Sequence, residues 1–264
     1  MPHCTPLETL LRRDRAVVVA GLCAVAALAW AYTVYLAQGM GHMDMGMGMA
    51  MPHMQSWNAM DFLSMFLMWA VMMVAMMVPT AAPMIVLFAT VNRRRQEQER
   101  PYVPTAVFLS GYLLVWMGFS VLATLVQWAF ERSELLDYTM ASTDNRFAGL
   151  LFVAAGLYQW TSLNELCLTQ CQRPFEFVMR HGGYRRDAPR SVMLGLRHGA
   201  YCVGCCWTLM ALLLVGGVMN VFWIVLLALL AYLERVPSMG RLIARLAGIV
   251  LIAAGAWLFS MGMS

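Results

Sequence analysis

The sequence predicts an all-α fold: a polytopic bundle of transmembrane helices with about seven spans and a cytoplasmic N-terminus. Three observations predict it. Hydrophobic residues make up 61% of the 264 residues, while charged residues make up only 12%, against about 25% in a typical soluble domain. Several apolar runs reach the roughly 20 residues that a span requires. The arginines fall in blocks between these runs.

The apolar runs are continuous and show no alternation of apolar and polar residues, which favours helices over a β-barrel. The predicted spans cover Ala16–Ala37, Asn58–Val91, Pro104–Phe130, Phe147–Leu166, Tyr201–Val215, Val218–Leu233 and Leu242–Phe259. The second span is longer than a bilayer requires and contains Pro79 and Pro83, so we expect a kink there. The first span lacks a small-residue cleavage site after its long apolar run, which favours an uncleaved anchor over a signal peptide.

Arginine supplies every basic residue of the chain, and its distribution predicts the orientation. Of the 18 arginines, 16 fall on one side of the seven-span arrangement, and only Arg132 and Arg146 fall on the other. Cytoplasmic loops are enriched in arginine and lysine, so the richer side is predicted to be cytoplasmic. Such blocks are a topology signal and do not predict nucleic-acid binding. The expected location is the bacterial inner membrane, with the lipid bilayer as the first partner.

The chain divides into three predicted parts: residues 1–37 with the first span, residues 38–56 as an outer loop, and residues 57–264 as a six-span membrane core. No Gly-x-x-x-x-Gly-Lys motif or soluble nucleotide domain is present in the sequence, so no nucleotide partner and no active pumping are predicted.

The predicted outer loop is rich in methionine and histidine. Thioethers are soft, neutral ligands that suit Cu(I), and imidazole accepts both copper oxidation states. Thiols would be lost to disulfides on an oxidising outer side, so thioethers are the sensible soft ligands there. A flexible linker of low complexity is the alternative, since such tracts are compositional signals. The candidate ligands in this loop are His42, Met43, Met45 and His53.

Methionines also recur along the second span at helical spacing. A ladder of thioethers would pass a soft cation by ligand exchange without burying a fixed charge in lipid. Methionine is equally a flexible filler of helix interfaces, so a packing role is the alternative. The candidate residues on this face are Met68, Met72, Met73, Met76, Met77 and Met84.

Five of the seven cysteines fall in two groups at the predicted cytoplasmic ends of the fourth and fifth spans. Their spacings of three and four residues place the members of each group on one helix face. Thiolates select Cu(I) or Zn(II), and a reducing cytoplasm keeps them free. Packing of small residues is the alternative. The predicted inner metal ligands are Cys167, Cys171, His198, Cys202, Cys205 and Cys206.

Three runs of residues carry a resemblance to a known family. They are Trp69-Ala-Val-Met72-Met73-Val-Ala75-Met76-Met77-Val-Pro79 with Pro83-Met84, Tyr158-Gln159-Trp160-Thr161 with Cys167-Leu-Thr-Gln-Cys171, and His198-Gly-Ala-Tyr201-Cys202-Val-Gly-Cys205-Cys206-Trp207 with Gly217-Val-Met219-Asn220. From Trp57 onward the chain resembles a bacterial family of predicted metal-binding integral membrane proteins, a domain of unknown function with AMMxP and CxxCCW signatures. The resemblance implies metal binding in a membrane and leaves the metal and mechanism open.

These patterns together predict a copper-handling membrane protein: a Cu(I) transporter or a membrane copper chaperone that passes the ion from the outer loop to the inner cysteines. Copper is the expected ion, with zinc as the alternative. The expected partners are a soluble copper-binding protein or a copper enzyme. We predict that the protein is not an enzyme. The alternatives are a membrane thiol oxidoreductase using its vicinal cysteines, and a copper-loading assembly factor without transport.

Overall fold

The computed structural model describes residues 6–44, 58–97, 105–133, 144–181 and 188–261, and these residues form helices with no strand among them. The predicted all-α fold is confirmed for this part of the chain. In chain order the helices are α1 (Pro6–Asp44), α2 (Ala59–Glu97), α3 (Thr105–Arg132), α4 (Asn145–Tyr158), α5 (Ser162–Gln172), α6 (Pro174–Arg180), α7 (Ala188–Ala211), α8 (Leu213–Gly216), α9 (Val221–Glu234) and α10 (Gly240–Met261).

Five helical stretches in the described residues are long and apolar enough to cross a membrane: Ala16–Gln38, Ala59–Val91, Thr105–Arg132, Ala188–Gly216 and Gly240–Met261. Their outer faces carry large apolar side chains; Leu28 is 72% exposed and Val250 is 66% exposed. A protein in water would bury such surface, so it faces lipid. The chain is a membrane protein. The count of seven spans and the cytoplasmic N-terminus stay predictions. α9, which the sequence predicted as a span, has only 14 residues.

The helices depart from the predicted spans in three places. The predicted span Phe147–Leu166 is two helices, α4 and α5, because the hydroxyl of Thr161 accepts a hydrogen bond from Asn164 N and caps a new helix. α7 begins at Ala188, well before Tyr201, where the fifth span was predicted to start. A helix can continue beyond its apolar stretch. α1 runs on to Asp44, past the predicted boundary at Ala37.

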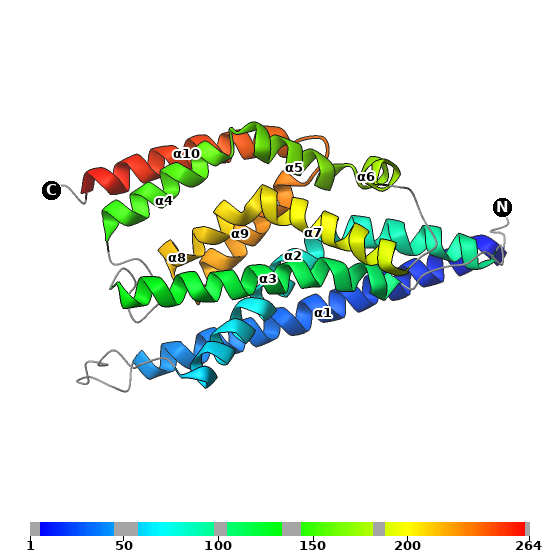
Figure 1. Cartoon of the computed structure of the whole chain (residues 1–264), viewed down its shortest axis with the longest axis horizontal. Coiled ribbons are helices and arrows are strands. Elements are labelled where there is room, and N and C mark those ends of the chain that lie inside the picture. The colour runs from blue at the N-terminus through cyan, green and yellow to red at the C-terminus, as the bar shows by residue number, and fades with distance from the viewer. Residues whose placement is uncertain (1–5, 45–57, 98–104, 134–143, 182–187, 262–264) are drawn as a thin grey trace.

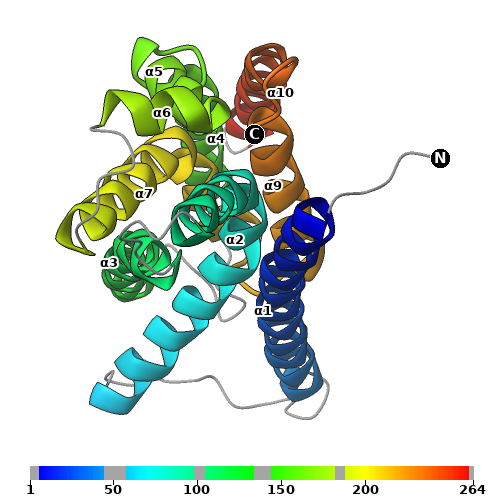
Figure 2. The same cartoon turned by 90° about the vertical axis from the view of Figure 1, so that its right-hand side faces the viewer.

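The helices form a bundle in which α10 and α4 lie together on one side and α1 lies on the opposite side, with α2, α3, α7 and α9 between them (Figures 1 and 2). α4 and α10 run antiparallel, and their backbones touch at glycines: a Cβ on Gly149 would lie 2.7 Å from the carbonyl oxygen of Gly255. α3 and α7 touch in the same way at Gly111 and Gly195. Small residues allow this close approach between membrane helices.

The helix α2 begins with a reciprocal cap and bends in its middle. Asn58 Oδ1 accepts from the backbone N–H groups of Met60 and Asp61, and Asp61 Oδ2 accepts from Asn58 N. Pro79 and Pro83 lie inside the helix, and Figure 2 shows that its two halves run in different directions. Proline removes a backbone donor and crowds the preceding turn, which accounts for the bend.

Candidate metal centre

Thiols from α5 and α7 meet in the interior of the bundle. Cys171 Sγ lies 4.0 Å from Cys205 Sγ. Cys205 Sγ and Cys206 Sγ lie 3.2 Å and 3.0 Å from the carbonyl oxygen of Cys202, which accepts hydrogen bonds from both. Cys202, Cys205 and Cys206 are almost fully buried. The two predicted groups of cysteines therefore converge at this point.

Arg235 stands at the centre of this convergence, directly after the end of α9. Its Nη2 donates toward three sulfurs, at 3.1 Å from Cys202 Sγ, 3.4 Å from Cys206 Sγ and 3.5 Å from Cys205 Sγ. The arginine is only 8% exposed. A buried guanidinium is costly unless its N–H groups find acceptors. Here the sulfurs and the carbonyl oxygens of Ala231 and Cys202 accept from Nη1 and Nη2, while Nε is buried without a hydrogen-bond partner among the described residues.

This role of Arg235 was not predicted from the sequence, where the residue is one of the arginines that predict orientation. The nearest signal in the sequence is its position: Glu234 and Arg235 directly follow a wholly apolar helix, whereas most arginines lie in hydrophilic stretches. A charged pair at that point is compatible with the membrane surface as well as with burial. Only the packing of α9 against α7 distinguishes a buried position of this pair from one at the membrane surface.

Cys167, on α5, packs against the core that contains this cluster. A Cβ on Gly204 would lie 2.7 Å from Cys167 Sγ, so the glycine makes room for this thiol. Burial raises the pKa of the Cys167 thiol above its usual value. A hydrogen bond with Cys202, then one with Cys205 and burial, raise the pKa of the Cys171 thiol well above its usual range. Both thiols on α5 are therefore protonated at neutral pH.

His198 lies one turn before Cys202 on α7, but its ring packs among aromatic side chains. The ring centroids of Phe177, Tyr112 and Phe108 are 5.3 Å, 5.8 Å and 6.1 Å from that of His198. His198 is 2% exposed, and its Nδ1 has no hydrogen-bond partner. Within the described residues, no three His, Cys, Asp or Glu side chains stand in an arrangement that could hold a metal ion. The predicted ligands would have to rearrange to do so.

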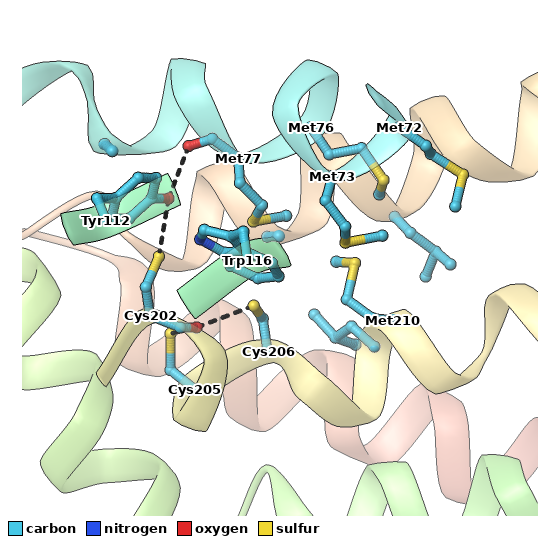
Figure 3. Close-up of a cluster of buried hydrophobic side chains, with 14 of the residues drawn as sticks. Met72, Met73, Met76, Met77, Tyr112, Trp116, Cys202, Cys205, Cys206 and Met210 are labelled. Atoms are coloured by element: carbon cyan, nitrogen blue, oxygen red, sulfur yellow. Dashed lines mark hydrogen bonds between the residues drawn. The ribbon is translucent and has the colours of Figure 1, made fainter. Parts of the chain in front are cut away.

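The methionine face of α2 is buried in the same core as the cysteines. All six predicted residues, Met68, Met72, Met73, Met76, Met77 and Met84, belong to this core, as does Met210 of α7. Figure 3 shows the thioethers of Met73 and Met77 directed toward α7, where Met210 and Cys206 lie. Met77 Sδ lies 3.8 Å from Arg235 Nη1. The methionine row therefore shares one core with the thiols and contacts, at Met77, the arginine that contacts them.

Tyr112 joins the methionine helix to the cysteine helix. Its hydroxyl donates to the carbonyl oxygen of Met77 at 3.1 Å and lies 3.4 Å from Cys202 Sγ (Figure 3). Tyr112 is fully buried. A single side chain of α3 thus fixes the spacing between the end of the methionine row and the first thiol.

The predicted ligands of the outer loop lie at the edge of the described chain or beyond it. α1 continues through His42 and Met43, whose side chains lie outside the described part. Met45 and His53 lie outside the described residues. Nothing in the fold therefore tests the loop.

A network of polar side chains joins the end of α9 to α4 and α5. Glu234 Oε1 accepts from Gln159 Nε2 at 2.7 Å, and the carbonyl oxygen of Glu234 accepts from Gln172 Nε2 at 2.7 Å. Asn164 Nδ2 donates to Gln159 Oε1. Glu234 is buried beside Arg235, so the network positions the arginine relative to the helix that carries Cys171.

These features define a class of protein: a helical membrane protein whose interior brings thiols, thioethers and one guanidinium together. The chain belongs to the family described as PpoB2, copper chaperone, whose model matches residues 66–258. The match runs from α2 into α10 and covers all the cysteines of the buried centre, but not the Met/His-rich loop. No curated protein and no solved structure matches the chain. The family supports a copper-handling role and agrees with the predicted resemblance at the level of a copper-related family.

Proposed function

We propose that this protein is a membrane copper chaperone that holds Cu(I) between α5 and α7 through the thiols of Cys171, Cys202, Cys205 and Cys206. The observation that carries the proposal is the meeting of these thiols from two helices, with Cys171 Sγ 4.0 Å from Cys205 Sγ. Cu(I) is soft and accepts two or three sulfur ligands. The copper chaperone family supports the choice of metal.

The buried methionine row supplies a path to these thiols in the proposal. Thioethers bind Cu(I) more weakly than thiolates do, so an ion that enters among them moves toward the cysteines. In this scheme the outer loop with His42, Met43, Met45 and His53 captures the ion. The methionines of α2 relay it, and the cysteines hold it at the cytoplasmic end of the bundle.

The proposed recipient is a soluble copper-binding protein or a copper enzyme on the cytoplasmic side of a bacterial inner membrane. Delivery without net transport would make the protein an assembly factor, and delivery of external copper would make it a transporter. Uptake of copper into sealed vesicles that contain the purified protein separates the two. Accumulation inside the vesicles indicates transport, and binding without accumulation indicates a chaperone.

A thiol oxidoreductase is the second candidate, and the Cys171–Cys205 distance of 4.0 Å is the observation in its favour. A disulfide needs an S–S distance of about 2 Å, which a small rotation of either side chain would bring about. That function requires a redox partner and predicts turnover of a dithiol substrate without copper.

Metal analysis of the protein purified in detergent under reducing conditions tests the proposal. We expect about one copper ion per chain, bound through sulfur only, and X-ray absorption at the copper edge would show it. The Cys23→Ser variant is the matched control, because Cys23 is an exposed cysteine of α1. Bound zinc, a copper spectrum without sulfur neighbours, or no metal at all would contradict the proposal.

A further inference from the structure

Arg235 places a positive charge among the sulfurs that the proposed function assigns to Cu(I). One guanidinium nitrogen, Nη2, reaches Cys202, Cys205 and Cys206 at 3.1–3.5 Å. A sulfur whose lone pairs accept from a guanidinium has fewer of them to offer a metal ion. Two positive charges a few ångströms apart in a buried site also repel each other strongly. Cu(I) and this guanidinium therefore compete for one place.

We infer that Arg235 is an exchangeable counter-cation: its guanidinium withdraws from the sulfurs when Cu(I) binds and returns when Cu(I) leaves. The inference rests on the proposed function and deepens it by naming what replaces the ion. Each thiol that becomes a ligand releases its proton to the medium. The guanidinium keeps its proton, and copper stays Cu(I) throughout.

The position of Arg235 in the fold allows this movement. The residue follows the last turn of α9, and the next three residues with exposed side chains, Pro237, Ser238 and Met239, form the turn to α10. The backbone of Arg235 therefore lies close to this exposed turn, although the side chain is buried. Rotation of the side chain alone would carry the guanidinium from the sulfurs toward that turn.

The exchange lowers the net affinity for copper and speeds its release. Thiolate sites hold Cu(I) tightly, and a chaperone must still give the ion up. A returning guanidinium offers the sulfurs hydrogen bonds at the moment the ion departs, so the emptied site is not left with buried polar atoms unpaired. A protein without this charge would keep its copper longer.

Substitution of Arg235 tests the inference through the release of copper to a water-soluble Cu(I) chelator. We expect Arg235→Gln to retain Cu(I) at least about tenfold more tightly than the native protein, which corresponds to about 1.4 kcal/mol. Arg235→Lys, which keeps the charge, should stay close to native. Arg241→Gln is the control, because Arg241 is an exposed arginine of α10 paired with Glu165.

The inference would be overturned if Arg235→Gln retained Cu(I) no more tightly than the native protein. It would also be overturned if Arg235→Lys retained Cu(I) as tightly as Arg235→Gln. Failure of the native protein to bind copper through sulfur would instead overturn the proposed function, and the exchange with it.

A second measurement uses the native protein and does not depend on whether a variant folds. Phenylglyoxal modifies accessible arginines, and peptide mass spectrometry reports each one. Arg235 should be protected in the copper-free protein and become modified on loading with Cu(I), while exposed Arg241 reacts in both. Protection of Arg235 in the copper-loaded protein would show that the guanidinium stays in place and would overturn the inference.

Discussion

Two sulfur-rich regions of the same core differ in how they treat charge. The thiol centre between α5 and α7 contains a buried guanidinium, while the methionine row on α2 is lined by neutral thioethers and apolar side chains. The α7 cysteines of the thiol centre and the methionine row are almost fully buried, so burial does not distinguish them. At Met77 a thioether of the row approaches Arg235, with Sδ 3.8 Å from Nη1.

Under the proposed function, this difference separates the thiols that would hold Cu(I) from the methionines that would pass it on. A site whose sulfurs already stabilise one positive charge has the polarity required to hold a different cation in its place. A row of thioethers binds a soft cation at each position without fixing it at any.

Replacement of Cys202, Cys205 and Cys206 by serine is expected to have the largest effect. Copper should fall from about one ion per chain to almost none, because hydroxyls are poor ligands for Cu(I). Serine is close in size and accepts hydrogen bonds from Arg235, so the fold should persist. Copper analysis beside size-exclusion chromatography in detergent measures both. Full copper content in this variant would mean that the cysteines serve packing alone.

The double change Met73→Leu and Met77→Leu should have an intermediate effect. Leucine nearly conserves volume, so each change should cost less than about 1.5 kcal/mol of stability. The amount of copper bound should stay the same, while loading from the methionine side should slow several-fold. Time courses of Cu(I) uptake by purified protein measure the rate. Equal rates in native and variant protein would make the row a packing feature.

His198→Phe should have the smallest effect on copper. The imidazole Nδ1 is buried without a partner, and such a group costs about 1–3 kcal/mol. A phenyl ring suits the surrounding aromatic rings, so thermal stability in detergent should be unchanged or higher. Copper content should stay near native. A loss of copper as complete as in the triple serine variant would place the imidazole among the ligands.

The spacing of residues along the sequence was enough to predict the membrane helices and the groups of cysteines. Long apolar runs predicted membrane helices, and five described stretches have the required length and composition. The i, i+4 relation of Cys167 and Cys171, and the similar spacing on α7, predicted groups of cysteines that could meet. These relations depend only on the pitch of a helix, which the sequence alone determines.

The role of Arg235 and the surroundings of His198 could not be predicted in the same way. Arg235 becomes buried because α9 packs against α2 and α7, far away along the chain. His198 shares a helix face with Cys202, but Phe108 and Tyr112 from α3 and Phe177 from α6 occupy the space around its ring. Both outcomes depend on tertiary packing between distant segments, for which spacing in one helix carries no signal.

The polar link between Glu234 and the helices α4 and α5 also has a consequence for biosynthesis. A ribosome completes α5 and α7 before α9, so the thiols enter the membrane earlier than the arginine that hydrogen-bonds to them. Glu234 and Arg235 arrive together, one joining Gln159 and the other joining the sulfurs. The centre can therefore be completed only after α9 has been synthesised, and a nascent chain that stops before α9 carries its cysteines without their cation.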